Sequence, residues 1–332
     1  MRLLVLIILT AAFGWSTFWF TGKTIRETAL KTWFTERNEA GWIVENTLSL
    51  RGFPNRFDAI IKDIKLKNPR TGWAWSTDRL EILQLSYQPN HFIVLWPKNQ
   101  QIDTPSQKLL VNSDELRGSV IFKPNSEHLL KRATISAESL TLSSNKNWDI
   151  TFKSLVLALR KSGKGDNLYD FGLDTKGFYL PQSFMNKIDS EESMPKYFKS
   201  LHLDTNIQFS KVLNQKSFKK GTTILQNLKI NDAHFEWGTL NVRAAGGMRL
   251  DMDGYPTGKL TIRIKNWEKA LDLLIENNSL DQSIKSTVRS AFKIFSALSG
   301  SKQELDIPLQ FSDRKIFLGF IPIGDAPRIK LP

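Results

Sequence analysis

Residues 240–265, LNVRAAGGMRLDMDGYPTGKLTIRIK, form the stretch that decides the fold. Apolar and polar residues alternate on both sides of its centre, as in Met248-Arg249-Leu250 and Leu260-Thr261-Ile262. A period of two is typical of a strand that buries one face. Between the two runs, Asp253-Gly254 and Pro256-x-Gly258 are turn-forming residues. The stretch therefore predicts a β-hairpin with one buried face.

The centre of this stretch has a competing interpretation. Asp251-x-Asp253-Gly254 resembles the opening of some calcium-binding loops, which close with a glutamate at the twelfth position. No glutamate stands at that position here. We therefore interpret the segment as a hairpin turn and expect no metal site in it.

The same alternation recurs from Trp42 to about Trp267, interrupted by turn-rich segments such as Asn68–Gly72. Regular alternation indicates antiparallel strands rather than the continuous apolar strands of a parallel sheet. More than a dozen strands are predicted, and their apolar positions include Leu80, Ile82, Phe92, Val94, Trp96, Leu116, Val120, Phe122, Ile150, Phe152, Leu155, Leu157, Leu159, Tyr169, Phe171, Leu173, Leu201, Leu203, Ile207, Phe209, Phe235, Trp237, Leu240 and Val242.

Helical periodicity returns near the C-terminus. One helix is predicted to begin at Trp267, and a second to lie between Ser279 and Gly300. Two further strands then form a closing hairpin around Ser312-Asp313-Arg314. The buried positions of these elements are Trp267, Ala270, Leu271, Leu274, Leu280, Ile284, Val288, Phe292, Phe295, Leu305, Ile307, Leu309, Phe311, Ile316, Leu318 and Phe320.

These patterns together predict an α+β, β-rich fold. It would consist of a long curved antiparallel sheet with an N-terminal membrane and post-membrane helix and two C-terminal helices. No linker-like composition divides residues 42–332. We therefore predict a single elongated domain over that range.

Residues 1–22 are apolar apart from Arg2 and are long enough, at about 1.5 Å per residue, to cross the roughly 30 Å of a bilayer's hydrocarbon. Aromatic residues gather at the far end of the run, as at a membrane interface. We predict an uncleaved transmembrane anchor, with these residues in contact with lipid: Leu3, Leu4, Ile7, Ile8, Trp15, Trp19 and Phe20. The alternative is a signal peptide cleaved near Ala12-Phe13-Gly14.

Residues 23–41 predict an amphipathic helix that continues from the span. Ile25, Ala29 and Trp33 recur every four residues, with Leu30 and Phe34 beside them, and we expect this aromatic stripe to pack within the protein rather than to form a binding face. The positive charges after the span favour a cytosolic body by the positive-inside rule, but large C-terminal domains are translocated regardless of flanking charge. We predict that the body lies outside the cytosol.

The composition restricts the possible functions. The 332 residues contain no cysteine, which excludes disulfides, thiolate metal sites and cysteine nucleophiles. The net charge of +13 is dispersed along the chain, so it favours a membrane surface over nucleic acid as the anionic partner. No nucleic-acid partner is expected.

Motifs for catalysis are missing. The four histidines are far apart in sequence, so no zinc-binding spacing exists, and no nucleophile elbow is present. Lys161-Ser162-Gly163-Lys164-Gly165 has the residue types of a phosphate loop without its strand–loop–helix context, and we interpret it as a flexible basic turn. His91 follows the turn pair Pro89-Asn90 and is interpreted as a hydrogen-bonding residue that braces the turn. We expect no enzymatic activity, no cofactor and no metal.

Several short segments, taken in order, resemble a membrane-anchored envelope family of alphaproteobacteria known as domain of unknown function 2125. No single one is specific, and the departure is Arg314, where glycine would suit the turn better. The segments are Trp42, Arg51-Gly52-Phe53-Pro54, Arg56-Phe57, Gly72-Trp73, Tyr87-x-Pro89-Asn90-His91, Pro97, Gln100, Asp253-Gly254-Tyr255-Pro256-x-Gly258, Leu305-x-Ile307-Pro308-Leu309 and Leu318-Gly319-x-Ile321-Pro322.

The resemblance implies a single-pass inner-membrane protein with a periplasmic body and no established activity. A weaker similarity to AsmA-type envelope proteins implies a curved sheet whose concave apolar face carries lipid. We therefore expect a protein that binds or passes phospholipid or another acyl lipid. The lipid-facing candidates are Phe92, Val94, Trp96, Val120, Phe122, Phe235 and Trp237. The alternative is a scaffold that binds another envelope protein and carries no lipid.

Overall fold

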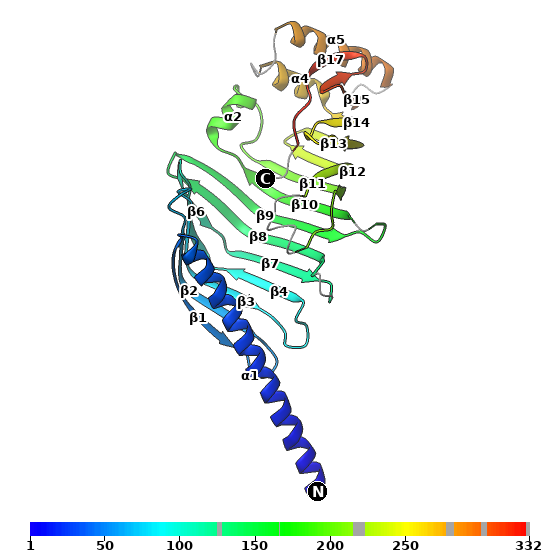
Figure 1. Cartoon of the computed structure of the whole chain (residues 1–332). Helices are drawn as coiled ribbons and strands as arrows, with labels where there is room; N and C mark the ends of the chain where they lie inside the picture. Colours follow the sequence, from blue (N-terminus) through cyan, green and yellow to red (C-terminus); the bar gives the residue numbers. More distant parts are fainter. Residues whose placement is uncertain (125–127, 166, 215–222, 277–281, 300–303, 330–332) are drawn as a thin grey trace. The chain divides into compact units, whose positions relative to one another are not determined.

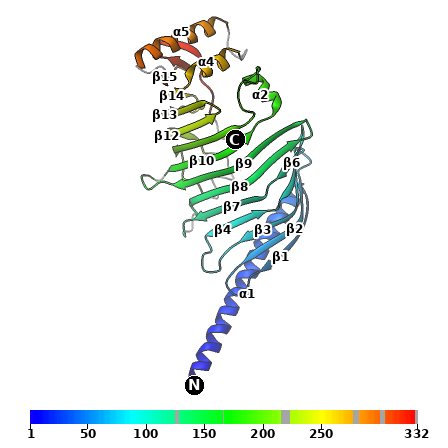
Figure 2. The same ribbon diagram turned by 180° about the vertical axis from the view of Figure 1, so that it is seen from behind.

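The computed structural model of the chain describes residues 1–124, 128–165, 167–214, 223–276, 282–299 and 304–329. The chain divides into two compact units. The first contains Met1–Ile121 and Ser136–Asn147, and the second contains Phe122–Ile135 and Trp148–Pro332. Figures 1 and 2 show the elements of both units from opposite sides.

One continuous helix, α1 (Arg2–Glu39), contains both the predicted membrane span and the predicted post-membrane helix. No proline occurs before Gly41, so the backbone hydrogen bonds run uninterrupted through the helix. The helix ends where the sequence predicts, because Gly41 adopts a left-handed conformation (φ +85°).

The first unit continues with antiparallel strands. β3 is paired with β2 along its length, with β4 at its C-terminal end and with β5 at its N-terminal end. The pairs β1–β2, β4–β7, β5–β6 and β6–β8 complete the pattern. The strands are β1 (Ile43–Arg51), β2 (Asp58–Lys67), β3 (Ala74–Leu83), β4 (His91–Trp96), β5 (Asn99–Asp103), β6 (Lys108–Asn112), β7 (Glu115–Phe122) and β8 (Leu130–Ser144).

Pro97 ends β4, as the sequence predicts, because proline has no N–H to donate to a strand ladder. The neighbouring strands β6 and β7 are interrupted at Ser113-Asp114. There the N–H of Ser113 donates to the carbonyl of Lys98 at 2.9 Å. The break between β6 and β7 therefore lies beside the break between β4 and β5.

Helix α1 packs on the sheet of the first unit. Phe34 is buried with Ile61, Ile64 and Leu66 of β2. The predicted packing of the stripe is confirmed for Leu30 and Phe34 and is wrong for Ile25 and Trp33, which are 63% and 41% exposed. The packed face is the adjacent one, with these residues buried or half-buried: Trp19, Gly22, Arg26, Leu30 and Phe34. Both stripes have helical spacing, and the contacts that choose between them are long-range.

The second unit consists mainly of strands that pair in sequence order, from β9 with β10 through to β16 with β17. Its elements are β9 (Trp148–Lys161), β10 (Leu168–Tyr179), α2 (Gln182–Ile188), β11 (Phe198–Phe209), β12 (Leu225–Trp237), β13 (Leu240–Leu250), β14 (Pro256–Lys265), α4 (Trp267–Glu276), α5 (Gln282–Ser299), β15 (Glu304–Ser312), β16 (Lys315–Leu318) and β17 (Ile321–Asp325). The 17 strands of the described residues form antiparallel sheet, which confirms the β-rich fold class with N-terminal and C-terminal helices.

The hairpin predicted from residues 240–265 is confirmed as β13 and β14. In its turn, the N–H of Gly254 donates to the carbonyl of Asp251 at 3.0 Å. The N–H of Tyr255 donates to the carboxylate of Asp251 at 2.9 Å. The carboxylate that suggested a calcium ligand therefore braces the turn.

The closing hairpin, β15 with β16, is also confirmed. Asp313 and Arg314 both have positive φ, +51° and +61°, in a two-residue turn that suits glycine. Two interactions hold Arg314 there: an ion pair with Asp253 at 2.9 Å, and a cation–π contact in which its guanidinium lies 4.6 Å from the ring centre of Tyr255. Strand β17 and helix α2 were not predicted. Ser279, Leu280 and Gly300 lie outside the described residues.

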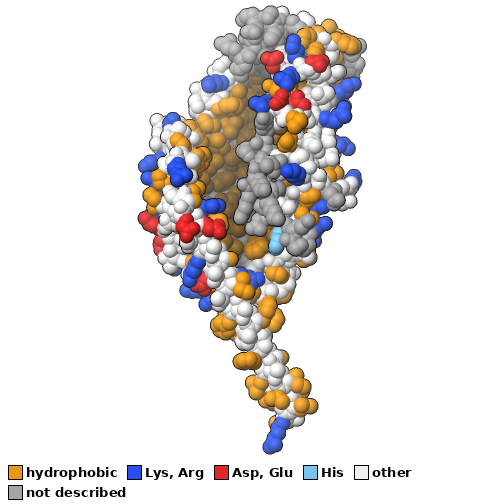
Figure 3. All heavy atoms as spheres, viewed as in Figure 1, with side chains coloured by type: hydrophobic (Ala, Val, Ile, Leu, Met, Phe, Trp, Pro, Cys, Tyr) orange, Lys and Arg blue, Asp and Glu red, His pale blue; other side chains and the backbone are white. Residues whose placement is uncertain are grey.

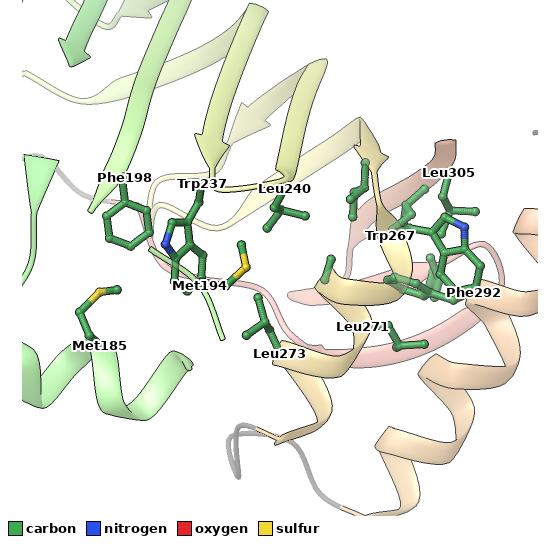
Figure 4. Close-up of a cluster of buried hydrophobic side chains, with 14 of the residues drawn as sticks. Met185, Met194, Phe198, Trp237, Leu240, Trp267, Leu271, Leu273, Phe292 and Leu305 are labelled. Carbon is green, nitrogen blue, oxygen red and sulfur yellow. The ribbon is translucent and has the colours of Figure 1, made fainter. Parts of the chain in front are cut away.

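The main core of the second unit lies between the strands and the helices α2, α4 and α5 (Figure 4). Trp237 is at its centre, with Phe198 4.9 Å away between ring centres. The indole N–H of Trp237 donates to the carbonyl of Pro195 at 2.7 Å. Other buried members are Phe178, Met185, Met194, Leu240, Ile264, Trp267, Ala270, Leu271, Leu273, Phe292, Leu305, Ile307 and Leu318.

Asp189 fastens the loop that carries Met194 into this core. Its buried carboxylate accepts hydrogen bonds from the hydroxyl and N–H of Ser193 at 2.7 and 3.0 Å, and from the N–H of Met194 at 2.8 Å. Burial alone would raise the pKa of Asp189, but these hydrogen bonds outweigh it and lower the pKa.

We expect Asp189→Asn to lower the free energy of unfolding by about 1–3 kcal/mol at neutral pH, because buried donors lose an ionised acceptor. A lowered pKa stabilises the fold above the pKa of the unfolded carboxyl, and this contribution disappears as pH falls through the folded pKa. Denaturant unfolding of both proteins between pH 7 and pH 2.5 tests this. The difference should shrink below about pH 4, and a difference independent of pH would contradict the ionised role.

Candidate functional site on the apolar face of the second unit

Strand register in the second unit places side chains in rows that cross the strands. One row, called here the Leu157 row, takes one residue from each of seven neighbouring strands on the same face. Its members, in order, are Leu157, Leu173, Leu203, Ala233, Ala244, Ile262 and Ile307. With strands about 4.8 Å apart, the row is about 29 Å long.

The rows on either side of it on this face are also mainly apolar. One contains Leu155, Thr175, Leu201, Phe235, Val242, Ile264 and Leu305. The other contains Leu159, Phe171, Thr205, Ile230, Gly246, Leu260 and Leu309. We call these three rows the apolar face.

The opposite face of the same strands is polar. Directly behind the Leu157 row lie Val156, Asp174, His202, His234, Arg243, Arg263 and Asp306. Arg263 and Asp306 form a two-pronged pair with N–O distances of 2.7 and 2.8 Å, and Arg263 lowers the pKa of Asp306. The sheet of the second unit is therefore strictly two-sided, with charge on one face and hydrocarbon on the other.

The apolar face is covered unevenly. At β14 and β15, Ile264, Leu305 and Ile307 are buried in the core under the helices. From β9 to β13 the Leu157 row is only half-buried, at Leu157, Leu173, Leu203, Ala233 and Ala244. Figure 3 shows hydrophobic side chains gathered in a hollow over the middle strands of this unit. Apolar surface thus remains accessible along the part of the row away from the helices.

A basic turn lies next to the apolar face, where β9 turns into β10. Lys161 is paired with Tyr169 two residues beyond the pair Leu159–Phe171, and so on the same face. A shallow cavity of about 520 Å³ is lined by the turn Lys161–Gly165 together with Lys123 and Lys131. Because the turn joins two strands, it is not the strand–loop–helix of a phosphate loop. It does gather four ammonium groups, those of Lys123, Lys131, Lys161 and Lys164.

Tyr169 anchors the adjacent backbone. Its side chain is completely buried, and its hydroxyl accepts a hydrogen bond from the N–H of Leu213 at 3.0 Å. Burial raises the pKa of Tyr169. Tyr169 therefore fixes the position of the backbone at Leu213.

The sequence-predicted lipid-facing residues are in both units. In the first unit, Phe92, Val94 and Trp96 lie half-buried in β4 on one face of the sheet. Val120 is paired with Phe92 and shares that face, and Val94 is paired with Ile82, which packs in the core beneath α1. Phe122, the last residue of β7, is also half-buried.

Phe122 belongs to the second unit. The other two candidates in that unit, Phe235 and Trp237, are packed by the protein. Phe235 is half-buried in the main core, with its ring centre 5.3 Å from that of Phe198. Trp237 is 3% exposed and its indole N–H is bonded within the protein. Sequence alternation identified the face of these residues correctly, but not the loop around Pro195 that covers them. The half-buried leucines of the Leu157 row show the same alternation of apolar and polar residues in the sequence.

Three of the four histidines, His91, His202 and His234, have hydrogen-bonding partners. The N–H of His91 donates to the carbonyl of Gln88 at 3.1 Å, and its imidazole is 2.9 Å from the hydroxyl of Ser119. His202 contacts Asp174 at 2.6 Å, and His234 lies 2.8 Å from the amide of Asn241. Within the described residues, no group of three or more His, Asp or Glu side chains is placed to hold a metal ion.

Helix α1 is long and apolar enough to span a membrane. Of its predicted lipid-contacting residues, Leu3, Leu4, Ile7 and Ile8 are 57–72% exposed, and Phe20 is 58% exposed. Trp15 is 39% exposed, whereas Trp19 is 4% exposed because it packs against the first unit. Hydrophobic side chains cover the protruding part of the helix in Figure 3.

A comparison with protein families finds one match. The matching family is described as "Uncharacterized protein conserved in bacteria (DUF2125)", and the match covers residues 19–327. No curated protein matches the chain. The match begins inside α1 and includes almost all of both units, so the family resemblance is confirmed over nearly the whole chain.

Proposed function

The chain belongs to the DUF2125 family, and from this premise we propose that it is a non-enzymatic envelope protein that binds or passes lipid on the apolar face of its second unit. In this proposal α1 anchors the protein in the inner membrane by a single span, and the two units lie in the periplasm. The acyl chain of the lipid occupies the half-buried part of the Leu157 row.

The observation that carries this proposal is the half-buried run from β9 to β13. Apolar surface left in water costs about 25 cal/mol per Å², so a run of leucines on one face of a sheet favours an apolar occupant. The half-buried part of the row crosses five strands and is about 19 Å long, which is enough for the 15 Å that an acyl chain occupies in one leaflet of a bilayer about 30 Å thick. Ala233 and Ala244 at its centre leave space that larger side chains would fill.

The basic turn supports an anionic lipid as the occupant. Lys161 follows Leu159 on the apolar face, so a lipid lying along the leucines would place its headgroup near the lysines of the turn. Lysine near a phosphate contributes through charge and hydrogen bonding. Phosphatidylglycerol, with one phosphate and two acyl chains, has the chemistry that this arrangement fits.

Purification in mild detergent followed by lipid mass spectrometry tests the proposal. We expect phospholipid at a fixed ratio to the protein, and a loss of at least several-fold in Leu157→Asn. The matched control is Val156→Asn, because Val156 is the preceding residue, is 38% exposed and faces the polar side. Both variants should unfold at similar temperatures to the parent protein. Equal lipid content in all three proteins, or none in any, would contradict lipid binding at this face.

A second candidate function rests on the exposed stripe of α1. Ile25 and Trp33 are exposed beyond the apolar span, and Ala29 lies between them on the same helical face. An exposed apolar stripe at this spacing fits the groove of a partner helix. If the protein contains no lipid but is crosslinked to a second membrane protein through position 33, the scaffold function is the correct one.

A further inference from the structure

The last turns of the apolar run of α1 are bound to the rest of the first unit. The indole N–H of Trp15 donates to the carbonyl of Pro54 at 3.0 Å. The apolar run continues beyond Trp15 to Thr21, so a helix inserted over its whole apolar length would take this contact into the membrane.

Residues 15–21 cover about 10 Å of this apolar run at 1.5 Å per residue, and along these residues the helix is bound to the loop Gly52–Phe57. The indole N–H of Trp19 donates to the carbonyl of Arg56 at 2.8 Å. Phe57 is stacked on Trp19, and Phe53 is stacked on Phe20 with 6.0 Å between ring centres. The helix cannot enter the membrane to its full apolar length unless this loop enters with it.

We therefore propose that the loop Gly52–Phe57, together with the neighbouring turn at Tyr87, is seated in the outer part of the bilayer that α1 crosses. This membrane seat binds a lipid surface, and it rests on the proposed anchor. It is separate from the apolar face of the second unit.

The loop has the surface of a membrane-interfacial segment. Phe53 is 53% exposed although it is a large apolar residue, and Tyr87 is 63% exposed. The turn of Tyr87 lies beside the loop because the N–H of Ser86 donates to the carbonyl of Asn55 at 2.8 Å. Exposed phenylalanine with tyrosine and tryptophan near it is the composition found where proteins meet the headgroup region.

Several backbone groups of the loop have hydrogen-bonding partners within the protein. Besides the two indole bonds, the N–H of Arg56 donates to the carbonyl of Gly52 at 2.7 Å, and the N–H of Phe57 donates to the carbonyl of Gln84 at 2.8 Å. Pro54 has no N–H to satisfy. In a bilayer, unpaired backbone groups are strongly unfavourable, so a loop with internal partners is suited to that depth.

Charged groups define the upper limit of the seat. Lys23 is the first ionisable residue of α1 after the span, Arg51 precedes the loop, and Arg56 lies near its end. Arg56 is about half exposed and also pairs with Asp58 at 2.9 Å. Arginine and lysine side chains at this position can reach headgroup phosphates while their stems lie along hydrocarbon.

Depth-dependent quenching tests the membrane seat. The chain contains no cysteine, so single variants F53C, Y87C, W73C and F13C can each be labelled with an environment-sensitive fluorophore. The labelled full-length protein is reconstituted into vesicles of phosphatidylethanolamine and phosphatidylglycerol that contain nitroxide lipids. Trp73 is the matched control, since it is 52% exposed and lies beyond the opposite end of β2 from the loop.

We expect nitroxide lipids to quench the labels at positions 13 and 53 several-fold, and headgroup-level nitroxides to quench the label at 87. The label at 73 should be unaffected. Quenching at 13 without quenching at 53 would overturn the membrane seat and leave the anchor intact. Quenching at neither position would overturn the anchor itself.

A second pair of variants tests the docking of α1 while leaving the loop sequence unchanged. A side chain at Gly22 would lie 2.8 Å from the ring of Phe57, whereas one at Gly14 would meet nothing within 4 Å. Gly22→Leu should therefore reduce quenching of the Y87C label at least twofold, and Gly14→Leu should not. Equal quenching in both would show that helix docking does not set the depth of the loop.

Discussion

Replacing Trp237 with alanine is expected to lower the free energy of unfolding of the second unit by about 3–5 kcal/mol, the usual cost of removing a large aromatic side chain from a core. Trp237 is 3% exposed and packs against Phe198. The substitution leaves a cavity and also removes the donor for the carbonyl of Pro195. Denaturant unfolding followed by far-ultraviolet circular dichroism measures the change.

Two controls separate packing from hydrogen bonding. Trp237→Phe keeps most of the ring and loses the donor, so it should cost about 1–2 kcal/mol. Trp73→Ala removes the same side chain from a site that is 52% exposed and should change stability by less than about 0.5 kcal/mol. If Trp237→Ala cost no more than Trp73→Ala, the loop around Pro195 would not cover the core as described.

Replacing Gly246 with alanine is expected to destabilise the β13–β14 hairpin by at least about 1–3 kcal/mol, because a Cβ there overpacks against backbone. The added atom would overlap the carbonyl oxygen of Lys259 and lie 2.8 Å from the Cα of Leu260. A Cβ added at Gly258 would likewise overlap the carbonyl oxygen of Gly247 and lie 2.8 Å from the Cα of Met248 on the paired strand. Backbone atoms of a paired strand cannot move aside as a flexible side chain can.

Gly247 is the matched control for this substitution. It is the next residue of the same strand, and a Cβ added there would meet nothing within 4 Å. Gly247→Ala should therefore be neutral or stabilise the protein by up to about 1 kcal/mol through the unfolded chain. Thermal unfolding of the two variants should give shifts of opposite sign or very different size. Equal shifts would contradict the close approach of the strands at Gly246.

The sequence was informative wherever a structural preference is local. Asp253-Gly254 with its flanking alternation predicted β13 and β14, and Pro97 predicted the end of β4, because turn and strand preferences depend on neighbouring residues. The register of the apolar face also followed from alternation, since a period of two fixes which side chains share a face.

The sequence alone could not predict contacts between residues that are far apart in the chain. Ile25 and Phe34 belong to two stripes with equal helical spacing, and only the docking of Trp19 and Gly22 against residues 54–57 decides which stripe is buried. Trp237 has the alternation of an open face, yet a loop some 40 residues away in sequence covers it. Arginine is not a residue type that favours the left-handed backbone found at Arg314. That conformation is stabilised by contacts with Asp253 and Tyr255 from another hairpin.

The order of the strands in the second unit has a consequence for how the protein folds. From β9 to β17 each strand pairs with its neighbour in sequence. Most of these pairings close only a short loop; the longer connections are those before β11, β12 and β15. Because closure entropy grows slowly with loop length, its cost stays small although the sheet is large. A chain that emerges from its N-terminus can add strands one at a time to a growing edge. Such stepwise pairing lets the sheet form while the chain is still emerging, before its last residues are available.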